Sequence, residues 1–221
     1  MLHVDQSLSD LALAQPAASR VFRELRLDFC CGGGRSLREA CAERELDPVT
    51  VLDRIATVDT HVSGRDLRSL PLAELIDHLL MTFHESHRRE LPDLIELAEK
   101  VERVHADKPE APVGLAAHLV AMRRALEDHM RKEEEVLFPA ILRGAGASLA
   151  MPIRVMETEH DEHGQGLRRL RELAGDFVAP VVACTSWKAL LLRCEQLEAD
   201  LMAHVQIENH VLFPRVLSGG E

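Results

Sequence analysis

The sequence contains very few aromatic side chains. Phe and Trp together make up 3% of the residues, and Tyr is absent. Strands are enriched in aromatic and β-branched residues, whereas the Ala, Leu, Glu and Arg that dominate here are strong helix formers. The composition therefore argues against a β-rich fold and predicts an all-α protein.

An excess of positive charge is also missing. The formal net charge is −11, and binding to nucleic acid requires clustered Lys and Arg to neutralise phosphates, so this class of partner is disfavoured. No apolar run is long enough to span a bilayer, and the N-terminal MLHVDQSLSD lacks the basic and then apolar regions of a secretion signal. Five cysteines, an odd number with two adjacent, do not form the framework of a secreted disulfide protein. We therefore expect a cytoplasmic protein without a membrane partner.

Hydrophobic periodicity divides the chain into two parts. Residues 1–57 contain short helical segments, predicted over Pro16–Leu27, after the S-x-x-E capping box at Ser36, and from the Asp47–Pro48 start signal. Residues 58–70 lose the periodicity and are predicted to be a linker. Residues 71–221 have room for four long helices with short connections, which predicts an up-down-up-down four-helix bundle.

Breakers and apolar spacing set the expected limits of the four helices. The first helix follows Pro71, with a kink expected at Pro92. The other three are expected over 114–142, over 152–177, and from Thr185 or Ser186 to Leu217.

One motif occurs twice in the bundle. Residues 129–139 are HMRKEEEVLFP and residues 204–214 are HVQIENHVLFP, so H-x-x-x-E-x-x-x-L-F-P recurs 75 positions later. Positions four apart lie on one face of a helix, so each copy places an imidazole beside a carboxylate. A single copy is common on solvated helices, but duplication at a matching offset indicates a metal site.

A second pair of motifs, H-x-x-H, lies at nearly the same offset in HESH (84–87) and HDEH (160–163). His84 and His160 continue apolar faces and are favoured as ligands. His87 and His163 are the alternatives, and otherwise they would support the ligands or lie at the rim of the site. A lone histidine on such a face is usually a core residue, but here all four helices contribute. The predicted metal ligands are His84, His129, Glu133, His160, His204 and Glu208.

This donor set is too large for one tetrahedral ion and suits two metals sharing both glutamates. The remaining polar residues are expected to have other roles. His118 is expected to be structural or supporting. Glu134 and Glu135 are expected to be solvated, and His210 to point elsewhere. The residues predicted to lie on the surface are His3 and His61, and those predicted to be packing residues are Cys41, Cys184 and Cys194.

The second chemical feature is Cys30-Cys31-Gly32-Gly33-Gly34. Adjacent cysteines rarely form a disulfide with each other, because the small ring strains the peptide bond between them. The helix that starts after Ser36 would lower the thiol pKa, and a thiolate binds soft metals or attacks electrophiles. The alternative is a pair of buried cysteines beside a turn, but the glycine run favours a functional site at Cys30 and Cys31.

These motifs together resemble the Repair of Iron Centres family. The resemblance rests on DFCCGGG, VERVHADKP (101–109), HMRKEEEVLFP, VMETEHDEHG (155–164) and ENHVLFPR (208–215), and it covers essentially the whole chain. It implies a hemerythrin-like bundle holding two non-haem irons, with Glu133 and Glu208 as bridges and an oxo or hydroxo bridge between the ions. It also implies that Cys30 and Cys31 receive or pass iron. Oxygen-carrying hemerythrins use H-x-x-x-x-D on the last helix, so the H-x-x-x-E here argues against reversible oxygen carriage.

The resemblance implies repair of iron–sulfur clusters damaged by nitric oxide or oxidants, with the di-iron site as the iron source. Partners would be proteins with damaged or apo clusters, and nitric oxide or oxygen as small ligands. Two docking sites are open for the small N-terminal module, its own bundle or a second subunit, and the second would give a homodimer. Two alternatives remain open: an enzyme that reduces nitric oxide or peroxide, and a sensor or carrier of a diatomic gas. Iron release, turnover with a reductant, and reversible binding without iron loss distinguish the three.

Overall fold

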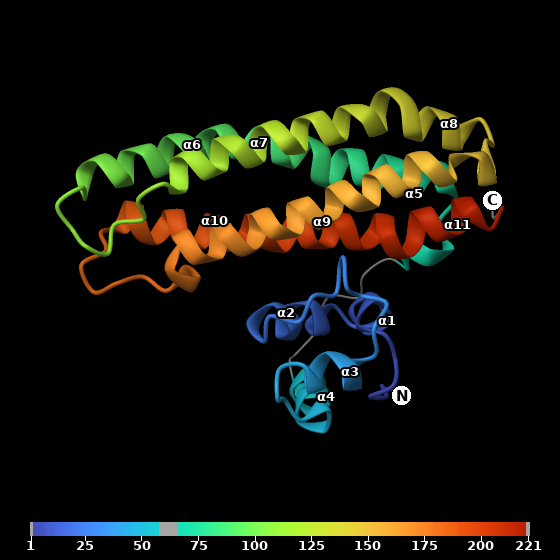
Figure 1. Cartoon of the computed structure of the whole chain (residues 1–221), viewed down its shortest axis with the longest axis horizontal. Coiled ribbons are helices and arrows are strands. Elements are labelled where there is room, and N and C mark those ends of the chain that lie inside the picture. Colours follow the sequence, from blue (N-terminus) through green and yellow to red (C-terminus); the bar gives the residue numbers. More distant parts are fainter. Residues whose placement is uncertain (1, 58–65, 220–221) are drawn as a thin grey trace. The chain divides into compact units, whose positions relative to one another are not determined.

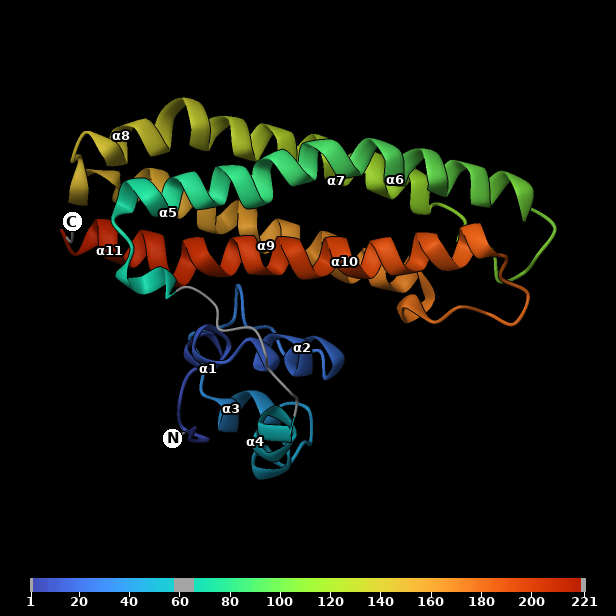
Figure 2. The same cartoon turned by 180° about the vertical axis from the view of Figure 1, so that it is seen from behind.

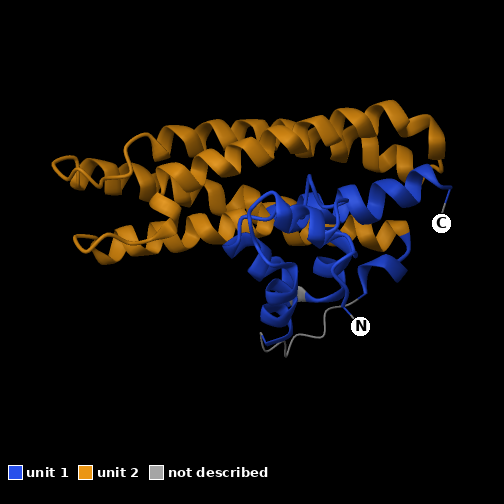
Figure 3. Cartoon of the chain, turned by 60° about the horizontal axis from the view of Figure 1, so that its bottom comes forward, with its two compact units in different colours: residues 1–71, 202–221 blue, residues 72–201 orange. Residues whose placement is uncertain are grey.

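The structure, a computed structural model, describes residues 2–57 and 66–219. Across these ranges the regular elements are helices, and the strand-like pairing is limited to an isolated bridge between Ser7 and Ser36. The chain forms two compact units, coloured separately in Figure 3. Unit 1 combines Met1–Pro71 with Met202–Glu221, and unit 2 is Leu72–Leu201. The all-α fold class predicted from the composition is confirmed.

The N-terminal part of unit 1 is built from short helices whose starts are encoded locally. Ser36 forms the predicted capping box: its Oγ accepts the Glu39 N–H at 3.2 Å, and the Glu39 carboxylate accepts the Ser36 N–H at 2.9 Å. The first helix was not predicted, because seven residues are too short a window for periodicity. The helices are α1 (Leu8–Ala14), α2 (Pro16–Glu24), α3 (Leu37–Ala42) and α4 (Pro48–Thr57).

Apolar side chains from all four short helices form one core. Phe22 and Phe29 lie at its centre, both essentially inaccessible, with ring centroids 6.0 Å apart. Met202, from the C-terminal segment of unit 1, packs against the same core. Most of the predicted linker, residues 58–65, lies outside the described residues, as does His61; the short 3₁₀ turn η1 (Leu67–Ser69) follows it.

Unit 2 is a four-helix bundle (Figures 1 and 2). Packing and ion pairs connect its helices in a ring: α6 packs on α7 and α7 on α9, Arg171 of α9 pairs with Glu198 of α10, and Arg193 of α10 pairs with Glu90 of α6. The elements are α5 (Leu72–Leu79), η2 (Leu80–His84), α6 (Glu85–Val104), α7 (Leu115–Lys132), η3 (Glu133–Leu137), α8 (Phe138–Leu142), η4 (Gly146–Leu149), α9 (Ala150–Leu173), η5 (Gly175–Phe177) and α10 (Thr185–Ile207).

The helix limits differ in detail from those predicted. Helix α6 runs through Pro92 without ending, and a π-helical turn, η2, precedes α6 in the first long helix. Helix α9 ends at Leu173, and a separate 3₁₀ turn with Asp176 at a positive φ continues to Phe177. The unit boundary falls inside α10, which continues through η6 (Glu208–Leu212) into α11 (Phe213–Leu217) in unit 1.

Three π-helical turns occur at the predicted ligands. His84 is the last residue of η2, Glu133 is the first of η3, and Glu208 is the first of η6. π-Turns inside α-helices are rare and are frequent at functional sites. The two copies of the duplicated motif therefore share a backbone irregularity as well as a residue pattern.

None of the helices in residues 2–57 and 66–219 is both long and apolar enough to cross a membrane.

Candidate metal centre and thiol loop

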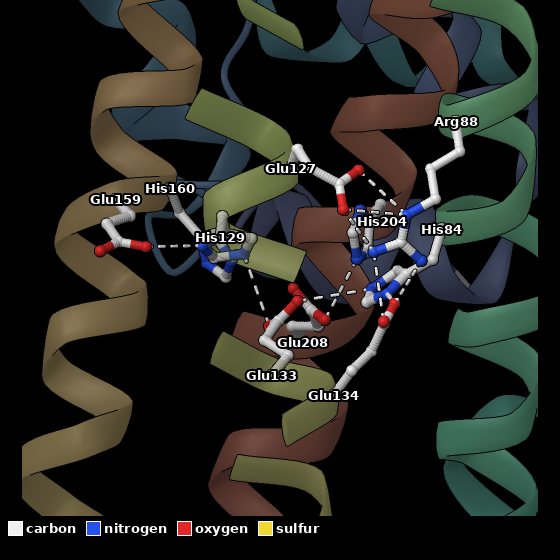
Figure 4. Close-up of polar contacts among 10 residues, drawn as sticks. All are labelled: His84, Arg88, Glu127, His129, Glu133, Glu134, Glu159, His160, His204 and Glu208. Carbon is white, nitrogen blue, oxygen red and sulfur yellow. Dashed lines mark hydrogen bonds and ion pairs between the residues drawn. The ribbon is translucent and has the colours of Figure 1, made fainter. Parts of the chain in front are cut away.

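His84 in unit 2 is completely buried, and its outer ring nitrogen is held by a carboxylate (Figure 4). His84 Nδ1 lies 2.7 Å from Glu134 Oε1, and Arg88 Nη1 lies 2.7 Å from the same oxygen. Burial opposes ionisation of Glu134, but the hydrogen bonds from Arg88 and His84 outweigh it and keep the pKa of this carboxyl below its usual value. Since a carboxylate only accepts, His84 Nδ1 donates in this hydrogen bond, and the other ring nitrogen, Nε2, faces Glu133 in the interior.

His129 is held in the same way by a carboxylate from α9. Its Nδ1 donates to Glu159 Oε2 at 2.9 Å, and Lys132 pairs with the other oxygen of Glu159. The inner Nε2 of His129 faces His160 Nε2 at 3.1 Å. His129 and His160 are both buried, so their ring nitrogens meet inside the bundle.

Glu133 lies between these histidines. Its Oε2 is 3.4 Å from His84 Nε2, and its Oε1 is 3.4 Å from His129 Nε2. The carboxylate is fully buried. The two oxygens of this one carboxylate therefore face the inner nitrogens of two different imidazoles.

The donor chemistry of this group fits metal ions. His129, Glu133 and His160 each offer a ligand atom, and these atoms lie within 4.8 Å of one another. Metal-binding histidines usually donate their other N–H to a carboxylate, as His84 and His129 do here. A buried carboxylate is electrostatically costly without a positive charge nearby, which a bound cation would supply.

In unit 1, the second copy of the motif repeats the first. His204 Nε2 lies 3.2 Å from Glu208 Oε1, and both side chains are buried. The corresponding pair in unit 2, His129 and Glu133, has a separation of 3.4 Å. The i,i+4 spacing thus brings an imidazole and a carboxylate together in both copies, as predicted.

The thiol loop of unit 1 gathers a third set of metal-type ligands: Asp28, Cys30 and Cys31. Asp28 Oδ1 accepts the backbone N–H of Cys30 at 3.2 Å and that of Cys31 at 3.0 Å. The two sulfurs are 3.7 Å apart, and neither cysteine forms a disulfide. The prediction of a lowered pKa is wrong for Cys30: the adjacent Cys31, burial and the Asp28 carboxylate raise the pKa of this thiol well above its usual value.

Two residues next to Glu208 donate hydrogen bonds to the thiol loop. His210 Nε2 donates to the Cys30 carbonyl at 2.8 Å, and Asn209 Nδ2 donates to the same oxygen at 3.3 Å. His210 was expected to point away from the metal ligands, and its partner could not be predicted because Cys30 is far away along the chain. Within unit 1, the segment that carries His204 and Glu208 therefore also binds the backbone of the cysteine pair.

Comparisons with known proteins agree with this chemistry. Residues 75–216 match the Hemerythrin HHE cation binding domain, and residues 4–59 match a Domain of Unknown function (DUF542). The chain is 46% identical over 219 residues to the iron-sulfur cluster repair protein YtfE of Shigella boydii serotype 4 (strain Sb227), covering 99% of this chain and 100% of the relative. The proteins of the same name from Escherichia coli O17:K52:H18 and from Escherichia coli O1:K1 have the same identity and coverage. The chain belongs to this repair-protein family.

Membership confirms the family and the hemerythrin-like fold that the motifs indicated. The HHE domain is a cation-binding domain, and the buried His and Glu side chains in residues 75–216 are groups that could bind a metal ion.

Several predicted roles need correction or addition. Glu134 is not simply solvated: its side chain is 28% exposed and it contacts His84. Glu159 was missed, because it points away from the face of its neighbour His160 and reaches a histidine on another helix. Cys184 is exposed rather than packed, whereas Cys41 and Cys194 are buried as expected.

Other histidines keep supporting positions. His118 Nε2 donates to the Gly166 carbonyl at 2.8 Å, which agrees with a structural role. His163 is buried, and its ring lies edge-on to that of His129 with centroids 4.9 Å apart. His87 is also buried and lies beside Phe83. Glu135 and His3 are exposed as predicted.

We expect Glu134→Gln or Glu159→Gln to weaken metal binding. Each change removes the negative charge that orients a histidine, and loss of such a partner typically costs roughly 10- to 100-fold in metal affinity. Competition with a chromophoric chelator measures the affinity. Glu135→Gln, on the same π-turn but exposed, is the control and should retain the parent affinity. Affinities within twofold of the parent would show that these carboxylates do not support the site.

The thiol loop packs so closely against Phe29 and His210 at Gly33 that a side chain has no room there. A Cβ built there would lie 2.1 Å from the Phe29 carbonyl oxygen and 2.7 Å from His210 Nε2. Since the first contact is with backbone, Gly33→Ala should displace the loop and lower the free energy of unfolding by about 1–3 kcal/mol. Chemical denaturation measures this loss. Gly34→Ala, where a Cβ meets nothing within 4 Å, should leave stability nearly unchanged; equal effects of the two changes would contradict the packing argument.

Proposed function

We propose that this protein repairs iron–sulfur clusters damaged by nitrosative or oxidative stress by donating iron from a dinuclear site. The observation that carries the proposal is the Glu133 carboxylate, whose two oxygens face the inner nitrogens of His84 and His129. Homology supports iron–sulfur clusters as the acceptor of the iron, since relatives matching the full chain are named iron-sulfur cluster repair proteins.

The proposed site combines the donors of both motif copies. His84, His129, Glu133 and His160 would provide one part, and His204 with Glu208 the other. The duplication supports this set, because each copy places a buried carboxylate at the first residue of a π-turn, one helical turn after a buried histidine. Glu133 and Glu208 would bridge two irons, and an oxo or hydroxo bridge would offset a further part of the positive charge.

The imidazole and carboxylate ligands of the proposed site suit iron that is later released to an acceptor. Imidazole and carboxylate bind iron less tightly than the thiolate and sulfide ligands of a cluster, so transfer from one to the other is downhill. Arg88, Lys132, Glu134 and Glu159 would keep the imidazoles oriented while the cargo is absent. The site would then be ready to reload without rearrangement of its histidines.

The thiol loop is the proposed transfer point. Cys30, Cys31 and Asp28 offer ligand atoms within 4.8 Å of one another. The raised pKa of Cys30 keeps this thiol protonated at rest, which protects it from oxidation. Arrival of an iron ion would displace the proton, because metal binding deprotonates a thiol ligand.

The test is transfer of iron to an acceptor. Protein loaded with isotopically labelled iron without oxygen is mixed with an apo iron–sulfur protein, sulfide and a reductant, and cluster formation and label are followed in the acceptor. Donation predicts labelled clusters at a rate above that with an equal concentration of free iron plus chelator. Multiple turnovers of nitric oxide or peroxide with the label retained would favour the reductase, and reversible gas binding with the label retained would favour the carrier. Either result would overturn donation.

A further inference from the structure

A cysteine and a histidine from distant parts of unit 2 meet at one end of the bundle. His105 caps the C-terminus of α6, and Cys184 directly precedes α10. In Figures 1 and 2 the connection after α6 and the connection before α10 lie at the same end of the bundle. His105 Nε2 is 3.2 Å from Cys184 Sγ. This pair belongs to none of the groups with metal-type ligands described above.

The surroundings of Cys184 favour a reactive thiol. Its sulfur accepts the backbone N–H groups of Trp187 and Ser186, at the start of a helix of 23 residues. These backbone hydrogen bonds, together with His105, lower the pKa of the Cys184 thiol below its usual value. The side chain is exposed, so a reagent in solution can reach the sulfur.

The histidine is fixed by packing. Its ring lies against the indole of Trp187, with centroids 5.0 Å apart, and Trp187 is buried. Of the charged side chains described nearby, Asp107 and Lys108 pair with each other at 3.0 Å, and Lys188 lies one turn into α10. The imidazole is therefore the titratable group in contact with the sulfur.

We propose that Cys184 and His105 form a nucleophilic pair, and that Cys184 is a modification site that exchanges with low-molecular-weight disulfides. The thiol proton passes to His105 Nε2, and the thiolate attacks one sulfur of the disulfide. A bond forms between Cys184 Sγ and that sulfur as the original S–S bond breaks. The departing thiolate takes the proton from His105, so one disulfide and one thiol yield a mixed disulfide and a free thiol.

The other cysteines provide internal comparisons. Burial raises the pKa of Cys194 to about 12 and also raises that of Cys41. Cys30 has a raised pKa for the reasons given above. Trp187 is the chain's single tryptophan, and it lies beside the pair. Its fluorescence therefore reports on chemistry at Cys184.

The test follows exchange with 4,4′-dithiodipyridine in the full chain, with peptide mapping by mass spectrometry to identify the modified cysteine. Cys184 should react first at pH 7, with an apparent pKa below the ordinary thiol value of about 8.5. His105→Gln should slow the reaction at pH 7 by about three- to tenfold and raise that apparent pKa, since less thiolate is present. Glutathione disulfide should change the Trp187 fluorescence of the parent but not of Cys184→Ser. His3→Gln, which replaces an exposed histidine in unit 1, is the matched control.

Two results would overturn the proposal. One is a Cys184 that stays unmodified while Cys31 reacts, or that titrates at the ordinary thiol value in the parent protein. The other is a His105→Gln variant with the parent's rate and pH profile. If His105→Gln fails to fold, the pH dependence of the Cys184 reaction rate in the parent protein tests the proposal by itself.

Discussion

Replacing Glu133 and Glu208 together with alanine should remove the bound iron. Protein purified without oxygen should carry about two irons per chain and, after exposure to air, show the absorption of a bridged pair. The double variant should retain almost none of either. In the proposed site Glu133 and Glu208 would supply the negative charge, and neutral imidazole ligands alone would not balance two cations in a buried position. Metal analysis and the visible spectrum measure both quantities.

A matched control changes two exposed carboxylates of unit 2. Glu135→Ala with Glu157→Ala removes the same number of charges from the surface and should leave the iron content at the parent value. Little iron in the parent, or a single zinc that survives the change of Glu133 and Glu208, would show that the duplicated motif is not the metal site. The proposed function would then lose its iron source.

Cys30→Ser combined with Cys31→Ser should separate storage of iron from its transfer. The variant should bind as much iron as the parent, because the His and Glu ligands are unchanged. Delivery to an apo-cluster acceptor should fall by about tenfold or more, since a serine hydroxyl does not ionise near pH 7 and is a poor ligand for iron leaving an N/O site. Iron content and the rate of cluster formation in the acceptor are the two readouts.

Cys184→Ser is the control for this variant, because it removes an exposed thiol outside the loop. It should transfer iron at the parent rate. Parent-like repair by the double variant would exclude thiol-mediated transfer while leaving iron donation intact. Loss of both iron content and transfer would instead show that the loop supports the iron site itself.

Features that depend on neighbours along the chain were predicted well. The capping box at Ser36 formed because its two partners are three residues apart. Each H-x-x-x-E brought its imidazole and carboxylate within 3.4 Å, because four residues make about one helical turn. The four long helices follow from apolar periodicity in the same way. Identification of the six residues as iron ligands stays a prediction, to be tested by the glutamate variant.

Features that depend on packing between helices were not predicted. Glu134 and Glu159 lie beside ligand candidates in sequence, yet each orients a histidine on a different helix, His84 and His129 respectively. The π-turns add to this difficulty, because an extra residue in a turn rotates every later side chain around the helix axis.

The sequence by itself determined the all-α class, the duplicated imidazole–carboxylate pairs and the adjacent cysteines, since each follows from composition or from spacing within one or two turns. Only the tertiary structure decided three features. These are the raised pKa of the Cys30 thiol, the hydrogen bond from His210 to the Cys30 carbonyl, and the contact between His105 and Cys184. Burial and the electric field at a thiol depend on groups that are distant in the chain and become neighbours when helices pack.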